Sequence, residues 1–498
     1  MTSKIPYSVQ DSARFAFEFD NQIARLDATD SYLIGVTRPQ KAVLKAVLAS
    51  AGLFGLFQPI LLCSGLAAAL FGTFSLLIVW RGVLLVNGAL RRLLWVEPGS
   101  APRTAPSPAS SPATGPETER PLYSILIAAY QEAPLMPQLA AALSRLDWPP
   151  DRLDVLILLE AHDRATKRAA AQLPFPPGTR ILTVPPGGPL TKPNALNYGL
   201  SQALGEFVVI YDVEDLPAPD QLQRAHNLFV KAPDELVCLQ ARLQADNPKA
   251  SWLAAQWALD YDLQFGLLLP GAALHKLPLL LGGTSNHFRR RALADLGGWD
   301  AYNVTEDADL GMRIARAGLR TQTFTSVTLE DAPVAWRIWL PQRGRWIKGY
   351  IQTWLVLMRA PGRTLKEMGG LNFLVMQLSL GGAILTPLSH AFLALLVLTA
   401  ALSRDLAIGQ AGLILLLAGY IVSLLVDLAA PGAWSWHRGV AVLTKPLYWP
   451  LLSLAAGLAI WDLAKRPHFW AKTPHTPRYT GRDAEPDPNC STGSSASS

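Results

Sequence analysis

A group of carboxylates follows a strongly apolar run near the middle of the sequence. The run Phe207–Tyr211 has the composition of a buried strand, and Asp212, Glu214 and Asp215 come directly after it. Because like charges repel one another, such a group is costly unless a positive charge neutralises it. Mg²⁺ or Mn²⁺ bridging to a diphosphate would do so, since both ions prefer oxygen ligands. The alternative is a set of helix-capping residues, a task that Asp220 could equally serve.

Two segments earlier in the chain carry groups that suit a nucleotide. Glu160 and Asp163 follow the predicted strand 155–159, where carboxylates can accept hydrogen bonds from a base or a ribose. An acidic loop without a ligand is the alternative. Lys192 follows the glycine pair 187–188 and opens a predicted helix. An ammonium group and a helix N-terminus both favour a diphosphate, although a lone lysine is more often a plain surface residue.

A second acidic group lies further along the chain. Thr305 precedes Glu306 and Asp307, just before a helical run over residues 310–317. A threonine N-cap with acidic residues in the first turn would explain this pattern structurally. The small-residue loop GGTSN at 282–286 would let the backbone approach a ligand closely.

The stretch QRGRW combines an amide, two guanidinium groups and an indole. Its members Gln342, Arg345 and Trp346 lie just before an apolar region. Arginine suits phosphate oxygens, and an indole face suits the apolar face of a sugar. An interfacial membrane anchor is the alternative interpretation.

Short apolar runs that alternate with helix-like stretches connect these groups. The strand candidates are 124–129, 155–159, 181–184 and 207–211, and the helix candidates between them are 135–146, 166–173 and 195–204. This alternation predicts an α/β domain over residues 121–350 with a largely parallel sheet. Open α/β sheets bind ligands at the carboxyl ends of their strands, where the groups above are expected to meet.

Two apolar regions flank this domain. The first, residues 42–90, is about twice the ~20 residues needed to cross a bilayer, and its interruption at Gln58-Pro59 predicts two spanning helices. The second, within residues 351–464, predicts interfacial and spanning helices. We expect four crossings there, with three as the next possibility, because Pro387 leaves open whether the run 373–402 crosses once or twice. Lysine and arginine at the ends of both regions place the termini and the domain in the cytosol.

Three polar segments complete the chain. Residues 1–41 are predicted to be a cytosolic N-terminal segment, 98–120 a disordered linker rich in proline, alanine and serine, and 465–498 a disordered basic tail.

The composition supports a membrane protein. Half of the 498 residues are hydrophobic and 16% are charged, whereas soluble domains have about 25% charged residues. The net charge of +6 is not concentrated on one element, which argues against a nucleic-acid-binding protein. The three cysteines are far apart and odd in number, so they predict neither a disulfide framework nor a metal site.

Taken in order, these motifs resemble glycosyltransferase family 2, and within it the membrane-bound, cellulose-synthase-like bacterial branch. The resemblance covers residues 123–350, a little under half of the chain. Its motifs are SILIAAYQEA, KPNALN, DVED, GGTSN, the triplet at 305–307 and the pattern Gln-x-x-Arg-Trp at 342–346. It implies a Rossmann-like nucleotide-sugar-binding domain of the GT-A type, with flanking transmembrane helices, on the cytosolic face of the membrane.

The resemblance also implies roles for individual residues. In such enzymes the acidic positions here occupied by Glu160 and Asp163 hold the nucleoside. The Asp-x-Asp motif that holds the metal and the diphosphate falls on Asp212 and Glu214, and Asp215 beside it is a third candidate for this task. Asp307 corresponds to the catalytic base. The remaining substrate-binding candidates are Lys192, Glu306, Gln342, Arg345 and Trp346, the last three at the acceptor end and near the diphosphate.

The sequence departs from the family pattern at two of these positions. The family usually has aspartate where this chain has Glu160, and the second metal-binding carboxylate, Glu214, is one methylene longer than usual.

The implied reaction is inverting transfer of a sugar from a nucleotide-sugar donor, with a UDP-sugar as the first candidate, to a growing polysaccharide. The implied location is the plasma (inner) membrane, with several crossings. Transfer of a single sugar to a lipid carrier is the main alternative. A transporter or scaffold with an inactive domain predicts the loss of an essential carboxylate, yet Asp212 and Asp307 are both present. A soluble nucleotide-binding regulator does not agree with the long apolar regions.

Overall fold

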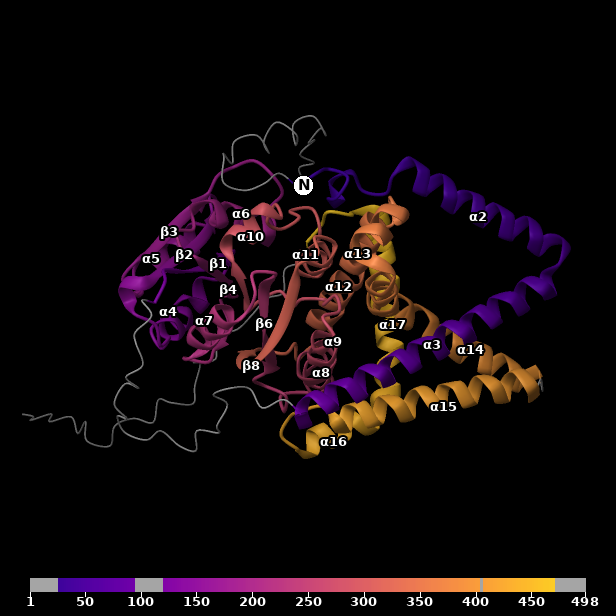
Figure 1. The fold of residues 1–498 in the computed structure, drawn as a ribbon. Helices are drawn as coiled ribbons and strands as arrows, with labels where there is room; N and C mark the ends of the chain where they lie inside the picture. The colour runs from indigo at the N-terminus through magenta and orange to yellow at the C-terminus, as the bar shows by residue number, and fades with distance from the viewer. Residues whose placement is uncertain (1–25, 95–119, 404–405, 471–498) are drawn as a thin grey trace, which may run out of the picture.

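The computed structural model describes residues 26–94, 120–403 and 406–470. Most of the predicted linker and tail, and residues 1–25 of the N-terminal segment, lie outside this part of the chain. The domain is built on one eight-stranded sheet, in the order β3-β2-β1-β4-β7-β6-β8-β5 (Figure 1). The strands are β1 (Tyr123–Ala129), β2 (Leu153–Glu160), β3 (Thr179–Val184), β4 (Phe207–Ile210), β5 (Leu216–Pro217), β6 (Leu236–Ala245), β7 (Asn286–Arg289) and β8 (Arg320–Glu330).

The sheet is mixed rather than largely parallel. Strands β1 to β4 are parallel, as the sequence predicted, and β6 is parallel to β8. Strand β7 runs antiparallel to both β4 and β6, and β5 runs antiparallel to β8. Strands β1, β2 and β4 are buried almost throughout, which explains their near-continuous apolar sequences.

Helices cover both faces of the sheet. Ile125 and Ile127 of β1 contribute to the core beneath α4, α5 and α7, whereas Leu126 contributes to the core on the opposite face, beneath α6, α10 and α11. This alternation follows from the two-residue period of a strand. The six helices are α4 (Met136–Leu143), α5 (Arg164–Ala171), α6 (Lys192–Gln202), α7 (Gln221–Lys231), α10 (Arg290–Asp295) and α11 (Glu306–Arg316).

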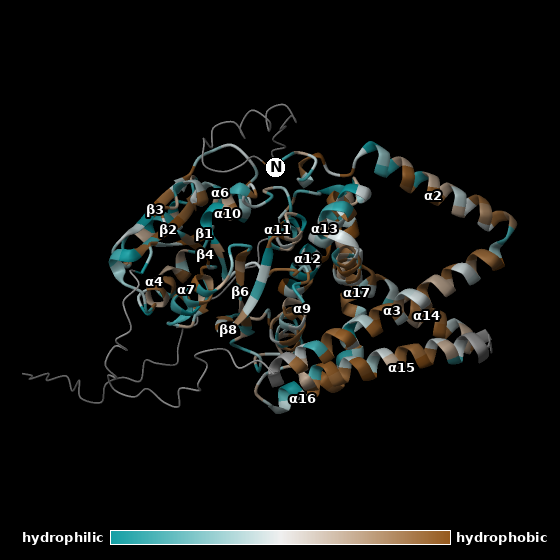
Figure 2. Cartoon of the chain, in the orientation of Figure 1, coloured by the Kyte–Doolittle hydropathy of each residue, from teal (hydrophilic) through white to brown (hydrophobic). Residues whose placement is uncertain are grey.

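Five helical segments of the described residues are long and apolar enough to cross a membrane. Figure 2 shows α2, α3, α14 and α15 extending away from the domain, with many residues in the hydrophobic colour. Helices α2 (Arg38–Phe57) and α3 (Pro59–Leu94) precede the domain, as predicted. Three candidates follow it. The first, Pro361–Leu402, includes the helix α14 (Gly382–Ser403), which continues through Pro387, and the number of crossings stays a prediction. The other two are α15 (Leu406–Ala429) and α17 (Lys445–Lys465).

Further helices connect the domain with the apolar helices. They are α8 (Trp252–Leu263), α9 (Leu269–Leu274), α12 (Trp336–Leu357), α13 (Pro361–Met376) and α16 (Trp436–Leu443), with π-helical turns at η4 (Gln264–Leu268) and η5 (Gln377–Gly381). Helix α3 lies so close to this layer that a Cβ on Gly88 would come 2.5 Å from the carbonyl oxygen of Leu267. Arg343 of α12 and Lys445 of α17 both pair with Asp260 of α8, at 2.9 and 3.0 Å. The domain is therefore joined to the apolar helices by packing and by ion pairs.

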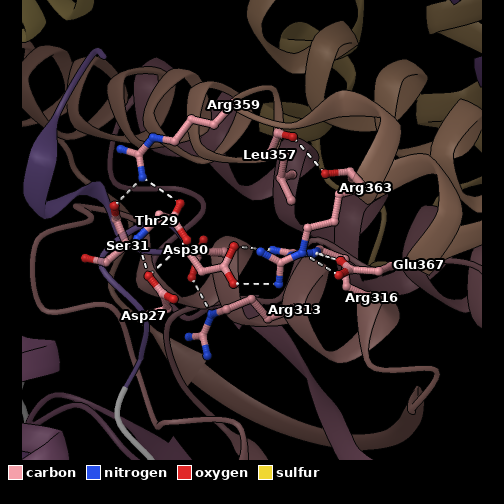
Figure 3. Close-up of polar contacts among 12 residues, drawn as sticks. Asp27, Thr29, Asp30, Ser31, Arg313, Arg316, Leu357, Arg359, Arg363 and Glu367 are labelled. Carbon is pink, nitrogen blue, oxygen red and sulfur yellow. Dashed lines mark hydrogen bonds and ion pairs between the residues drawn. The ribbon is translucent and has the colours of Figure 1, made fainter. Parts of the chain in front are cut away.

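The segment before α2 folds back onto the domain (Figure 3). Arg359 donates hydrogen bonds of 2.7 Å to the carbonyl oxygens of both Thr29 and Ser31. Asp30 pairs with Arg316 of α11 at 3.0 Å and with Arg363 of α13 at 3.2 Å. We call this contact of residues 27–35, which includes the short helix η1 (Tyr32–Ile34), with α11, α12 and α13 the N-terminal clasp.

Candidate active site

A cavity of about 470 Å³ lies at the carboxyl ends of β1, β2 and β4. Helices α6, α11 and α12 contribute to its polar part. Leu77 of α3, Ala383 of α14 and Leu452 of α17 line its apolar part. One continuous cavity therefore joins the strand ends to the helices that are candidates for crossing the membrane.

Lys192 and Asp212 form an ion pair in the polar part. The Lys192 Nζ also donates a 2.8 Å hydrogen bond to the carbonyl oxygen of Gly283. Burial alone would lower the pKa of Lys192, but Asp212 and Glu306 more than offset this effect and raise it. The lysine is therefore held as a cation beside the strand-end carboxylates, where it can face a diphosphate.

Glu214 lies close to two other carboxylates and lines the same cavity. Burial, Asp212 and Glu132 raise its pKa to about 8. The described residues contain no group of three or more acidic, histidine or cysteine side chains arranged for a metal. Two carboxylates are nevertheless a suitable donor set for Mg²⁺ or Mn²⁺, since Mg²⁺ sites commonly combine one or two carboxylates with substrate phosphates and water. Asp212 and Glu214 fit this arrangement.

Two of the predicted site residues lie behind the cavity and do not line it. Asp215 is 1% exposed, and its Oδ2 accepts hydrogen bonds from the backbone of Asp212, at 2.7 Å, and from the hydroxyl of Thr284. Asp163 caps α5 by accepting a 3.1 Å hydrogen bond from the backbone of Thr166. Its other oxygen accepts from the backbone of Gln131. Both carboxylates shape the loops that carry the site.

Glu160 ends β2 and reaches the cavity. Burial raises the pKa of its carboxyl group. Tyr130, which follows β1, lines the cavity beside it. This end of the cavity offers a carboxylate and an aromatic ring, which together suit a base or a ribose.

Glu306 and Asp307 are the first two residues of α11, and both line the cavity that Lys192 lines. Burial raises the pKa of Asp307, and burial together with Asp307 raises the pKa of Glu306 to about 7. A Cβ on Gly283 would lie 3.4 Å from Asp307 Oδ2 and 3.9 Å from Lys192 Nζ, so the glycine loop brings these two side chains together. The side chain of Thr305 makes no capping hydrogen bond to α11.

Helix α12 presents the Gln-x-x-Arg-Trp residues to the cavity. The buried Gln342 Oε1 has no hydrogen-bond partner among the described residues. Arg345 donates a 3.1 Å hydrogen bond to the carbonyl oxygen of Val304, next to the acidic triplet. The ring of Trp346 stacks on Tyr261, with 6.2 Å between centroids. These contacts fix the helix against α11 and leave an amide free to bind a ligand.

Several lining residues were not singled out from the sequence. Glu132 belongs to the SILIAAYQEA motif, and Arg343 is the first arginine of QRGRW. Glu330 ends β8, and burial together with Asp215 and Asp212 raises its pKa well above the usual range. Glu160 was predicted as a site residue because it is an acidic residue at the end of a strand, and Glu330 has the same position in β8. The Thr-rich sequence of β8, which lacks an apolar run, concealed it.

Comparisons with known proteins agree with this geometry. Residues 120–349 match the model of the family described as "Glycosyltransferase like family 2". A beta-monoglucosyldiacylglycerol synthase of Synechocystis is 27% identical over 270 residues, covering 52% of this chain and 54% of that protein. The catalytic subunit of cellulose synthase 1 of Komagataeibacter xylinus is 27% identical over 246 residues, covering 48% and 32%. The chain spans about half the length of the first curated relatives it matches.

A solved structure shares the fold. The mannosyltransferase PcManGT of Pyrobaculum calidifontis, in complex with GDP-Man and Mn²⁺, superposes with a TM-score of 0.51 at 23% identity. The match covers 79% of this chain and 99% of that one. The GT-A-type α/β fold expected from the motifs is thereby confirmed. Residues 120–349, a little under half of the chain, are thus similar to glycosyltransferase-like family 2, as the motifs indicated.

Proposed function

We propose that this protein transfers a sugar from a nucleotide-sugar donor, with a UDP-sugar as the first candidate, to an acceptor held at the membrane. The observation that carries this proposal is the single cavity in which Lys192, Asp212 and Asp307 meet and which continues to α3 and α14. Basic residues at the ends of the apolar regions support a cytosolic domain in the plasma (inner) membrane.

Asp212 and Glu214 would hold Mg²⁺ or Mn²⁺, and the bound ion would supply positive charge that offsets the charge of the leaving diphosphate. Lys192 binds the same diphosphate. Glu160 contacts the nucleoside, and Gln342 and Arg345 contact the donor from α12.

Asp307 accepts the proton of the acceptor hydroxyl as the oxygen attacks the anomeric carbon. The new bond forms on the face opposite the leaving diphosphate, so the anomeric configuration inverts. The raised pKa of Asp307 brings it closer to neutral pH, which suits a general base. Glu306, next to Asp307, adds negative charge to the site. It positions Lys192 by attracting the ammonium group of this residue.

For the acceptor, the cavity favours a lipid over the growing polysaccharide that we expected from the sequence. Its outer walls carry aliphatic side chains such as Leu77, Leu268 and Leu452, which suit an acyl chain better than a hydrated glycan. A relative named as a glycolipid synthase and a relative named as a cellulose synthase both match this domain. Polysaccharide extension is therefore the second candidate, and product size separates the two.

The test uses the full chain in lipid nanodiscs with a panel of nucleotide sugars, Mn²⁺ or Mg²⁺, and a chelator control. We expect nucleoside diphosphate release with one donor, and we expect Asp307→Asn to lower its rate at least about 10³-fold. Asp295→Asn, an exposed carboxylate of the same domain, is the matched control. Equal rates for Asp307→Asn and the native chain would exclude Asp307 as the base, and a native chain that binds no donor would exclude the proposed function.

A further inference from the structure

A second, smaller cavity of about 50 Å³ continues from the apolar end of the active-site cavity. It lies between α3, α14, α15 and α17. Five residues line both cavities: Leu77, Arg81, Thr386, Pro387 and Leu452. The two cavities therefore form one path from the carboxylates to the interior of the apolar helices.

Arg81 is the one permanently charged residue among the described residues that line this second cavity. It makes no hydrogen bond or ion pair with the described part of the chain. The nearby carboxylates are already paired, Asp260 with Lys445 at 3.0 Å and with Arg343 at 2.9 Å, and Asp427 with Lys445 at 3.6 Å. This group has two carboxylates and, with Arg81, three cations. Arg81 interacts electrostatically with Asp427, and these five groups together carry one net positive charge, which a bound anion would neutralise.

The depth of Arg81 matches the headgroup level of a bilayer. Pro59 begins α3 at the end of the α2–α3 hairpin farthest from the domain (Figure 1). Arg81 lies roughly 33 Å along the helix from Pro59 at 1.5 Å per residue, and the hydrocarbon core of a bilayer is about 30 Å thick. Beyond Arg81 the same helix packs on the domain through Leu84 and Gly88. With the start of α3 at the far face of a bilayer and the helix along the membrane normal, Arg81 would be level with the phosphates of the leaflet nearest the domain.

We propose that Arg81 binds the phosphate of an anionic lipid, one of whose acyl chains lies along the apolar helices with part of its length in the second cavity. Phe74 and Ile78 of α3, together with Val422 of α15, provide the apolar walls for that chain. The proposal rests on the proposed membrane orientation, and it deepens the proposed function. The lipid is either the acceptor, with its hydroxyl toward Asp307, or a resident lipid that closes the membrane end of the cavity.

Lipid retention tests this site without any turnover. The native chain is reconstituted in nanodiscs of phosphatidylglycerol, diacylglycerol and phosphatidylcholine, extracted into mild detergent, and analysed by native mass spectrometry. We expect one retained phosphatidylglycerol per chain in preference to diacylglycerol. Arg81→Gln should reduce this retention at least tenfold, and Arg81→Lys should preserve most of it. Arg38→Gln, which removes an exposed arginine at the start of α2, is the matched control and should change nothing.

The outcomes are separable from those of the activity test. Equal retention of phosphatidylglycerol by the native chain and by Arg81→Gln would overturn the proposal. A native chain that retains diacylglycerol to the same extent as phosphatidylglycerol would also overturn it, and this result does not depend on whether Arg81→Gln folds. If the sugar of the donor is labelled, label on the retained phosphate-bearing lipid identifies this lipid as the acceptor. Label on another product identifies the retained lipid as a resident lipid. A chain that retains phosphatidylglycerol but binds no donor would refute the proposed function and leave the lipid site standing.

Discussion

At the scale of single residues, the site concentrates carboxylates that are held partly protonated. Burial and Asp212 raise the pKa of Glu214 to about 8, and burial and Asp307 raise that of Glu306 to about 7. Both groups keep protons in the folded protein at pH values where the unfolded chain, with glutamate near 4.3, has lost them. The free energy of unfolding therefore falls as pH rises from about 4.5 to about 8, because the folded protein binds more protons.

A divalent cation that binds Glu214 must displace its proton. From a pKa of about 8, the ionised fraction at pH 6 is about 50-fold lower than at pH 8, and the affinity for Mn²⁺ should fall by a similar factor. Calorimetric titration with Mn²⁺, in the presence of UDP, measures this change. Glu214→Gln should bind Mn²⁺ weakly at both pH values. An equal affinity of the native chain for Mn²⁺ at pH 6 and at pH 8 would contradict the expectation.

For single residues, the sequence predicted the positions of the site residues but not the directions of all their side chains. It predicted which positions carry carboxylates near the site, and Glu160, Asp212, Glu214 and Asp307 do line the cavity. It could not tell that Asp215 turns back to the Asp212 backbone, because a side chain's direction depends on tertiary contacts. The roles assigned to these residues stay predictions until the variants are measured.

At the scale of elements, the contact between α12 and the start of α11 positions the expected base. Gly349 of α12 lies so close to Thr305 that a Cβ there would collide with the threonine side chain. Gly349→Ala should displace the acidic triplet, and a shift of about 1 Å can cost about 10²-fold in rate. We therefore expect kcat to fall by about that factor while the fold is retained.

Gly362→Ala is the control for this prediction, because a Cβ at that position of α13 meets nothing within 4 Å. Nucleoside diphosphate release gives the rate, and thermal unfolding reports the fold. A Gly349→Ala variant with native kcat would show that the α12 contact does not position Asp307.

The elements themselves were predictable where burial determines their sequence. Strands β1, β2 and β4 are apolar almost throughout because both of their faces are covered. Strand β8 is rich in threonine and half exposed, and β7 has only four residues, so neither shows a clear period. Their antiparallel and long-range pairings, which make the sheet mixed, depend on tertiary packing and left no pattern in the sequence.

At the scale of the whole molecule, Arg359 holds the N-terminal clasp together. Its Nη1 donates to Thr29 and Ser31, and its Nη2 donates to the carbonyl oxygen of Gly35 at 2.8 Å. Arg359→Met removes these donors at a cost of about 2–3 kcal/mol in clasp stability, since hydrogen bonds from charged groups contribute about 1.5–3 kcal/mol each and are not additive. Residues 27–35 should then be cut faster by a protease.

Limited proteolysis of the solubilised chain, read by mass spectrometry of the N-terminal fragments, checks this expectation. Arg38→Met lies just outside the clasp and is the matched control. Cleavage at the native rate in Arg359→Met would show that Asp30 and its partners Arg316 and Arg363 suffice to hold the segment.

The N-terminal clasp can close only late in the synthesis and folding of the chain. Residues 27–35 leave the ribosome well before their partners, which extend from Asp300 to Arg363, some 300 positions later. Helices α2 and α3 can enter the membrane while the segment in front of them is still unbound. Since long-range contacts form only after the intervening chain has folded, closure of the clasp comes late and requires both a folded domain and a finished helical hairpin. A chain that stalls before α13 lacks Arg363, so Asp30 cannot form this ion pair until α13 has been made.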